Sequence, residues 1–186
     1  MEIPLLETDG LLRLWAEAPG CGENARFQWI SPELLQWTAM AKEDSRKTLY
    51  LSDLRSFSLF GWISNAGLWR LDRGVGGGPL TIAGKPYERG IGVHADSRLV
   101  FEVPRGFSRF VTDIGYETGI STTRKLRFAV EVDGDKAFVS RPMAAGEVQA
   151  GVTVPVADAR KIVLITEAIG GNDAAHANWA DARFLR

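Results

Sequence analysis

The sequence predicts an all-β fold, a two-sheet β-sandwich, for residues 75–186. Short β-prone runs follow one another at regular spacing with turn residues between them; they cover residues 99–103, 107–114, 126–132, 152–156 and 162–167. No long helical pattern separates them. Asp133-Gly134, between FAVEV and KAFVS, fits a two-residue hairpin turn because both positions favour a positive φ. Many short strands joined by turns favour a sandwich.

The first 68 residues are predicted to form a separate, mainly β segment, with the sandwich domain at residues 69–186. One alternative is that this segment is the tail of an upstream domain. Within it, LLRLWAEA, ARFQWI and LLQWTAM fit three strands. Ser31-Pro32-Glu33 before the last of these equally fits the start of a helix, since serine caps helices and proline suits their first turn. Residues 48–54, TLYLSDL, are predicted as a further strand.

Composition and charge argue against several classes of partner. The chain of 186 residues has 22 basic and 23 acidic residues and a formal net charge of −1, whereas nucleic acids and anionic membranes are bound by concentrated basic patches. Its apolar stretches fall short of the about 20 residues that cross a bilayer. Cys21 is the single cysteine, so neither an intrachain disulfide nor a cysteine-based zinc site can form. We therefore expect no nucleic acid partner and no membrane span.

The stretch GIGVHADSRLVFEV, residues 90–103, joins a predicted strand to an isolated histidine. Its second half alternates apolar and polar residues, as a half-buried strand does. Its first half holds His94, one of only two histidines in the chain, followed by Asp96 and Ser97. This position fits a ligand-binding histidine, and it also fits a buried histidine whose ring nitrogens bond backbone atoms. Both interpretations stay open at this point.

Catalytic and metal-dependent functions receive little support from the spacing of residues. The chain has no G-x-S-x-G nucleophile elbow. A Ser97-His176-Asp181 triad, or a zinc site of His94, His176 and a carboxylate, would depend entirely on the fold. Carboxylates are plentiful, but no pair is marked out for glycoside hydrolysis. The acidic loops better suit a structural Ca²⁺, which takes oxygen ligands, and simple solvation of these carboxylates is the alternative.

Several motifs, in order along the chain, resemble one known family. They are GGGPLTIAGKPYERGIGVHADSRLVFEV, RFVTDIGYETG, LRFAVEVDGDKAFVS and HANWADARF. Residues 69–186 are similar to the NPCBM/NEW2 domain, a carbohydrate-binding module family that includes carbohydrate-binding module family 51. The resemblance implies a galactose-binding-like jelly-roll β-sandwich that binds galactose-containing glycans without catalysis. It also implies a structural Ca²⁺ and attachment to a larger bacterial protein.

The sequence departs from the family pattern in two places. Ala175 stands where the final motif commonly has an aspartate before the histidine, and Asn178 replaces the usual aspartate before Trp179. Residues 115–118, Gly-Tyr-Glu-Thr, stand where the strand end often reads G-x-D-D. Fewer loop carboxylates weaken the expectation of calcium and sugar binding, whereas the expected fold is unaffected.

A sugar offers hydroxyl groups in fixed directions and an apolar ring face, so its site combines hydrogen-bonding side chains with an aromatic platform. Loops at one end of a sandwich gather residues that are distant in sequence. The candidate ligand-binding residues are His94, Glu117, Arg124, Asn172, Asp173, His176, Asn178 and Trp179. Tyr116 or Trp69 could supply the platform instead of Trp179, whose alternative role is core packing.

The expected function is therefore non-catalytic binding of a glycan or small sugar by a monomeric module. Two alternatives stay open: a structural or protein-interaction sandwich that has lost its sugar site, and a fragment of a glycoside hydrolase. The family resemblance implies an extracytoplasmic or secreted protein. The N-terminus MEIPLLETDG lacks the basic start and apolar run of a signal peptide, so a cytoplasmic chain and a segment of a longer exported protein are both consistent with it.

Overall fold

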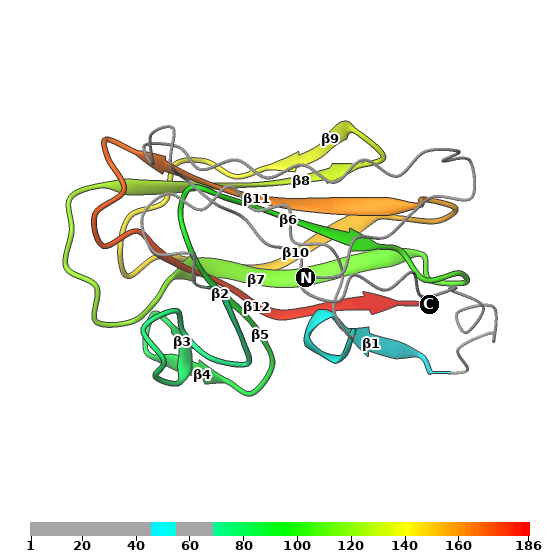
Figure 1. Ribbon diagram of the computed structural model, residues 1–186, viewed down its shortest axis with the longest axis horizontal. Coiled ribbons are helices and arrows are strands. Elements are labelled where there is room, and N and C mark those ends of the chain that lie inside the picture. Colours follow the sequence, from blue (N-terminus) through cyan, green and yellow to red (C-terminus); the bar gives the residue numbers. More distant parts are fainter. Residues whose placement is uncertain (1–45, 55–68) are drawn as a thin grey trace, which may run out of the picture.

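The computed structural model describes residues 46–54 and 69–186. The strands or helix expected at residues 11–18, 25–30 and 34–40 lie outside these residues. The described chain forms two antiparallel sheets that pack face to face, which confirms the predicted all-β sandwich (Figure 1). Among the described residues, no helix has the length and apolar character needed to span a membrane.

The first sheet has six strands in the order β10-β7-β12-β5-β2, with β1 also paired to β12. These strands are β1 (Thr48–Tyr50), β2 (Trp69–Leu71), β5 (Gly90–His94), β7 (Arg109–Tyr116), β10 (Val148–Pro155) and β12 (His176–Leu185). The second sheet has the order β6-β11-β8-β9. It consists of β6 (Ser97–Glu102), β8 (Lys125–Val132), β9 (Asp135–Val139) and β11 (Lys161–Ile169). A separate hairpin joins β3 (Leu80–Ile82) to β4 (Lys85–Tyr87).

The hairpin expected at Asp133-Gly134 connects β8 and β9, and both residues have positive φ, 50° and 104°. The run expected as one strand at residues 48–54 is shorter: β1 ends at Tyr50 and a 3₁₀ helix, η2 (Leu51–Asp53), follows. Leu49 and Leu51 are buried in the main core. Residues 48–54 are therefore part of the sandwich, although the predicted domain boundary at residue 69 placed them outside it.

The core lies between the two sheets and centres on large apolar side chains from both. Trp179 of β12 packs edge-to-face on Phe128 of β8, with ring centroids 5.1 Å apart. The Trp179 Nε1–H donates to Thr166 Oγ1 of β11 over 3.0 Å. This bond satisfies the one polar group of a fully buried indole, which would otherwise cost free energy. Trp179 thus connects the two sheets by packing and by a hydrogen bond.

The outer face of the first sheet is covered by the β3–β4 hairpin and the loop before it. Two glycines permit this close approach. A Cβ on Gly92 would lie 2.4 Å from the Arg73 carbonyl oxygen, and a Cβ on Gly115 would lie 2.5 Å from Ile82 Cγ2. A side chain at either position would force its neighbours, the covering segment among them, to move. The glycines of the GIGVH stretch and of strand β7 therefore make room for this hairpin.

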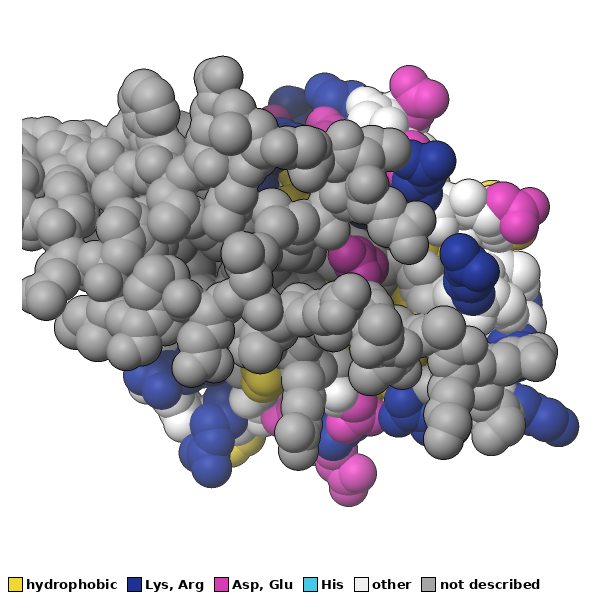
Figure 2. Space-filling view, turned by 45° about the vertical axis from the view of Figure 1, so that its right-hand side comes forward, with side chains coloured by type: hydrophobic (Ala, Val, Ile, Leu, Met, Phe, Trp, Pro, Cys, Tyr) yellow, Lys and Arg dark blue, Asp and Glu magenta, His cyan; other side chains and the backbone are white. Residues whose placement is uncertain are grey.

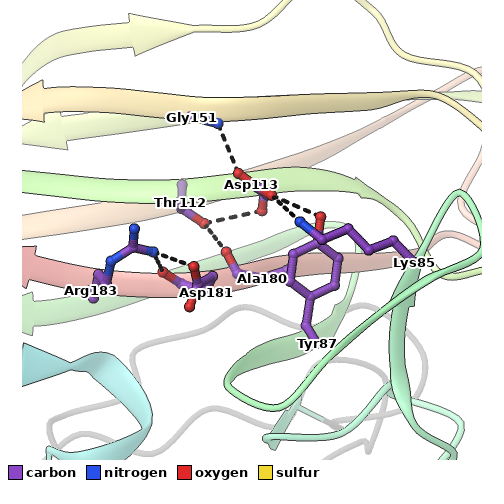
Figure 3. Close-up of polar contacts among 8 residues, drawn as sticks. All are labelled: Lys85, Tyr87, Thr112, Asp113, Gly151, Ala180, Asp181 and Arg183. Carbon is purple, nitrogen blue, oxygen red and sulfur yellow. Dashed lines mark hydrogen bonds and ion pairs between the residues drawn. The ribbon is translucent and has the colours of Figure 1, made fainter.

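Polar contacts fix the hairpin to the sheet (Figure 3). The Asp113 carboxylate of β7 accepts hydrogen bonds from Tyr87 Oη at 2.8 Å and from the Gly151 backbone N–H at 2.8 Å. Lys85 Nζ lies 3.5 Å from the same carboxylate. Burial and the bond to Asp113 raise the pKa of Tyr87 well above its usual value. The phenol therefore stays protonated and continues to donate at neutral pH.

The described part of the surface in Figure 2 carries no block of one charge. Figure 2 shows Lys and Arg side chains interspersed with Asp and Glu side chains over the described part of this face, and hydrophobic side chains in small areas only. Such mixing agrees with the formal net charge of −1.

Candidate functional site

The structure brings the two histidines together on the outer face of the first sheet. His94 ends β5, His176 begins β12, and the two are Cα partners in the ladder that joins these strands. Their ring centroids are 5.5 Å apart, with an angle of 63° between the ring planes. Next to them, the Ala95 backbone N–H donates to the Ala175 carbonyl over 2.9 Å. This bond continues the pairing of the two segments beyond the strands and holds the rings side by side.

The His94 ring has a fixed proton position when it is neutral. Its side chain is buried, with 9% exposed, and its Nδ1 lies 2.7 Å from the Ala95 carbonyl oxygen. A carbonyl oxygen can only accept a hydrogen bond, so Nδ1 carries the hydrogen. In the neutral imidazole, Nε2 is then a hydrogen-bond acceptor.

Glu117 fixes the second ring in the same way. Its Oε2 lies 3.2 Å from His176 Nδ1, and an ionised carboxylate only accepts, so this Nδ1 also carries a hydrogen. The Glu117 backbone N–H donates to the His176 carbonyl over 3.0 Å, which holds the two residues together a second time. Among the described residues, neither histidine Nε2 has a hydrogen-bond partner. The site therefore presents two acceptor nitrogens of the same tautomer.

The glycine-rich loop at residues 73–79 covers the Glu117 carboxylate, whose side chain is 13% exposed. A Cβ on Gly74 would lie 2.2 Å from Glu117 Oε1, so the carboxylate occupies the space that a side chain would need. Arg70 Nε holds the loop by donating to the Val75 carbonyl over 3.0 Å. Sequence reasoning did not predict Gly74 or Arg70 as part of the site; the available signal was the glycine run itself, because the first family motif begins with it.

Contacts of Arg124, Asn172 and Asp173 stabilise the loop that leads into His176. The Arg124 guanidinium forms an ion pair with the Asp173 carboxylate over 2.6 Å. The Asn172 carbonyl accepts the Ala175 backbone N–H over 3.1 Å. The Arg124 backbone carbonyl accepts a hydrogen bond from the Tyr116 hydroxyl over 3.2 Å. These contacts fix the position of His176 from the side of the loop.

Two predicted site residues are buried where no ligand can reach them. Trp179 is 0% exposed and lies between the sheets, and Asn178 is also 0% exposed. The Asn178 Nδ2 donates to the Thr81 carbonyl of the covering hairpin over 2.9 Å. The expectation that these two residues contact a sugar is therefore corrected: both have packing roles. The alternation along β12 directs Trp179 inward, and β3 covers the opposite face.

One of the named aromatic platforms keeps some exposed surface. Tyr116 is buried in the core with 1% exposed, so it offers no ring face. Trp69 is partly buried against the core and lies opposite Val93, the residue before His94. Paired residues of neighbouring strands point to the same face of a sheet, so Trp69 points toward the core with Val93, on the opposite face from His94.

The catalytic triad and the zinc site considered from sequence do not assemble among the described residues. Ser97 pairs with Thr166 in the second sheet, and Asp181 forms an ion pair with Arg183, so neither is positioned to act with His176. Within residues 46–54 and 69–186, no three His, Cys, Asp or Glu side chains converge to hold a metal ion. Ca²⁺ also binds backbone carbonyl oxygens, so the expected structural Ca²⁺ stays a prediction.

The protein is an antiparallel two-sheet β-sandwich with polar side chains gathered at the ends of separate strands. The model of the NPCBM/NEW2 domain matches residues 47–185. The chain belongs to this family. The match begins just before β1, in agreement with the pairing of β1 to β12.

Two solved structures show the same fold. The CBM51 of Clostridium perfringens GH95, solved in complex with methyl-galactose, is 26% identical, with a TM-score of 0.67 over 74% of this chain and 99% of that chain. The CBM51-2 and INT domains of Clostridium perfringens ZmpB, solved in complex with GlcNAc, are 29% identical, with a TM-score of 0.66 over 75% of this chain and 32% of that chain.

A curated relative is an enzyme of much greater length. Alpha-1,3-galactosidase B of Akkermansia muciniphila is 30% identical over 116 residues, which are 60% of this chain and 15% of that protein. The chain thus spans a small part of this relative.

Proposed function

We propose that this chain binds a neutral sugar without catalysis at the cluster of His94, His176 and Glu117, and that the ligand is a galactose-containing glycan. The observation that carries the proposal is the pair of neighbouring Nε2 acceptors, each set by the hydrogen bond at its own Nδ1. Support for the sugar class comes from the relatives, since the GH95 module was solved with methyl-galactose and the ZmpB module with GlcNAc.

The donor and acceptor pattern suits a hydroxyl-rich ligand. Sugar hydroxyls can donate to the two Nε2 atoms, because a neutral imidazole with a hydrogen on Nδ1 accepts at Nε2. Both Nδ1 bonds are made within the protein. The rings therefore need no reorientation on binding, which limits the entropic cost.

The expected affinity is modest. A shallow site with few direct hydrogen bonds corresponds to millimolar to high-micromolar dissociation constants, on the order of −4 to −6 kcal/mol. Hydrolysis of a glycosidic bond needs two carboxyl groups across the bond. Among the described residues, Glu117 is the single carboxylate bonded to the histidine pair, and one of its oxygens is engaged by His176. The proposed module therefore binds its sugar and leaves hydrolysis to another domain.

The relatives support a place for this module in a larger protein. The galactosidase relative is matched over 15% of its length, as an accessory domain of an enzyme would be. We propose that the module holds a bacterial glycoside hydrolase on its glycan outside the cytoplasm, and that it acts as a monomer.

Calorimetric titration with methyl β-galactoside and with GlcNAc tests the proposal. His176→Ala should weaken binding at least about tenfold because one of two acceptors is lost. It should leave the fold intact, since this side chain is 29% exposed. Lys136→Ala on β9, in the other sheet, is the matched control and should bind like the wild type. Absence of binding by the wild-type chain to either sugar would overturn the proposal.

A scaffold that has lost its sugar site is the second candidate, and the burial of Asn178 and Trp179 favours it. Separate substitution of His94 and Trp179 distinguishes the two functions. In a scaffold, both variants lose stability and no sugar binding is measured before or after the change. In a sugar-binding module, Trp179→Phe loses stability while the folded fraction still binds.

A further inference from the structure

Glu117 belongs both to the histidine cluster and to the lining of a separate hollow of about 380 Å³. Three turns line this space, which we call the turn hollow. Its lining residues are Ala83, Gly84, Glu117, Thr118, Gly119, Ile120, Ala145 and Gly146. Figure 1 shows the three turns at the end of the sandwich where β7 ends and β10 begins. The volume is at the small end of the roughly 300–1,000 Å³ that ligand pockets span.

The lining favours a neutral, hydroxyl-bearing ligand. Glu117 is its single ionisable side chain, and most of the other lining residues are small. Gly119 and Gly146 have positive φ, and a Cβ on either would meet no protein atom within 4 Å, so the backbone is open there. Neither glycine N–H bonds another described residue. The Gly119 and Gly146 N–H groups can donate hydrogen bonds, and the Ile120 side chain adds apolar surface. This combination suits a second sugar ring.

The first two walls are held by direct hydrogen bonds. The hairpin turn at Ala83-Gly84 is tied to the second turn by the Gly84 N–H, which donates to Thr118 Oγ1 over 3.0 Å. The Thr118 N–H in turn donates to the Thr81 carbonyl over 3.1 Å. These bonds make the two walls one unit, so the space between them is present before any ligand arrives.

The third wall of the hollow is the turn that contains Ala145 and Gly146, and hydrogen bonds to the Glu147 side chain stabilise it. The Glu147 carboxylate accepts the Ala144 backbone N–H over 2.9 Å and pairs with Arg141 over 2.9 Å. The hydrogen bond from the Ala144 backbone N–H, and to a lesser extent the one from Arg141, hold the pKa of Glu147 below its usual value. The carboxylate is therefore ionised at neutral pH and keeps both hydrogen bonds.

We propose that the turn hollow is a second subsite, which receives the sugar ring linked to the one bound at His94 and His176. The proposal rests on the proposed function of the histidine cluster. Glu117 connects the two places, because its Oε2 bonds His176 while the residue itself lines the hollow. The ligand class thereby narrows from a monosaccharide to the terminal disaccharide of a glycan.

The test compares a monosaccharide with disaccharides that carry the same terminal ring. Calorimetry is run with methyl β-galactoside and with two disaccharides ending in galactose, one β-1,4-linked and one α-1,3-linked. At least one disaccharide should bind the wild type about tenfold more tightly than the monosaccharide. Ala83→Trp, which places an indole at the hollow, should abolish this difference and leave the affinity for methyl β-galactoside unchanged.

Asp158→Trp is the matched control. Asp158 is exposed and has positive φ, 59°, close to the 49° of Ala83. Asp158 follows the C-terminal end of β10, whereas the hollow lies at the N-terminal end of this strand. The strand separates the two by about 25 Å. This variant should keep the wild-type preference for the disaccharide.

Amide spectra of the wild-type protein provide a readout that does not depend on a variant folding. The Gly119 and Gly146 signals should shift with the preferred disaccharide and stay in place with methyl β-galactoside. Equal affinity for all three sugars, or unmoved glycine signals, would overturn the second subsite while the function of the histidine cluster stands. No binding of any of the three sugars by the wild type would overturn both proposals.

Discussion

Glu117 and His176 are bonded to each other twice, once through the backbone and once through the side chains. The Glu117 N–H donates to the His176 carbonyl over 3.0 Å, and the His176 Nδ1 donates to Glu117 Oε2 over 3.2 Å. The first bond fixes where the two strands meet, and the second fixes which ring nitrogen is left to accept. The position and the chemistry of the histidine thus depend on the same neighbour.

Replacement of the Glu117 carboxylate should weaken sugar binding through His176. In Glu117→Ala the imidazole loses its anchor and samples both tautomers, so we expect a loss of about fivefold in affinity, equivalent to the about 1 kcal/mol of one hydrogen bond. Glu117→Gln should retain most of the affinity, because the amide oxygen still accepts from Nδ1. Titration calorimetry of both variants measures the difference, and equal losses would contradict the positioning role.

Gly74→Ala should disturb the same carboxylate from its other side. The new Cβ would lie 2.2 Å from Glu117 Oε1, so either the loop or the carboxylate must move. We expect a stability loss of about 1–3 kcal/mol from this overpacking, together with weaker sugar binding. Gly78→Ala is the matched control in the same loop, because its Cβ would meet no atom within 4 Å. Urea denaturation of the two variants should separate them, and similar curves would refute the close contact.

Asn178→Asp, which introduces the residue that the family commonly has, should destabilise this chain. The Asn178 Nδ2 donates to the Thr81 carbonyl, and a carboxylate in its place can donate nothing. The buried carboxylate would face a carbonyl oxygen without a donor for its own charge, so we expect a loss of about 2–3 kcal/mol at pH 7. Chemical denaturation measures this loss. Wild-type stability of the variant would show that the site can accept an aspartate.

Alkaline pH should destabilise the attachment of the β3–β4 hairpin. Burial and Asp113 raise the pKa of Tyr87 above its unfolded value near 10. The unfolded chain therefore loses this proton first as the pH rises, and stability falls above about pH 10. Tyr87→Phe should lose about 1 kcal/mol at pH 7 with the bond to Asp113, and should show a smaller further decline above pH 10. Denaturation curves from pH 7 to pH 11 test this; an unchanged alkaline decline would contradict it.

The sequence predicted those parts of the fold that depend on local patterns. The Asp133-Gly134 turn was recognisable because its backbone requirement is met by two adjacent residues. The meeting of His94 with His176 followed from motif order and family resemblance. By contrast, the bond from His176 to Glu117 joins residues of different strands, and neither residue carries a local signal of it.

The roles of Asn178 and Trp179 were mispredicted for a physical reason. Alternation along β12 indicates two faces but does not say which face is open to solvent. Here the inner face meets the second sheet and the outer face meets the β3–β4 hairpin, so both residues are buried. The indication lay in Gly92 and Gly115, which flank Asn178 in the sheet and leave room for the covering segment.

The most direct test of the central claim is to observe the histidine side-chain nitrogens while sugar is added. The chain has only two histidines, so long-range ¹H–¹⁵N spectra of the imidazoles contain two sets of signals. In the neutral form of both rings we predict a hydrogen on Nδ1 and a bare Nε2. On saturation with methyl β-galactoside or GlcNAc, the two Nε2 signals should shift with a single dissociation constant. Nε2 signals that stay in place while sugar binding is measured on the same sample would contradict the account.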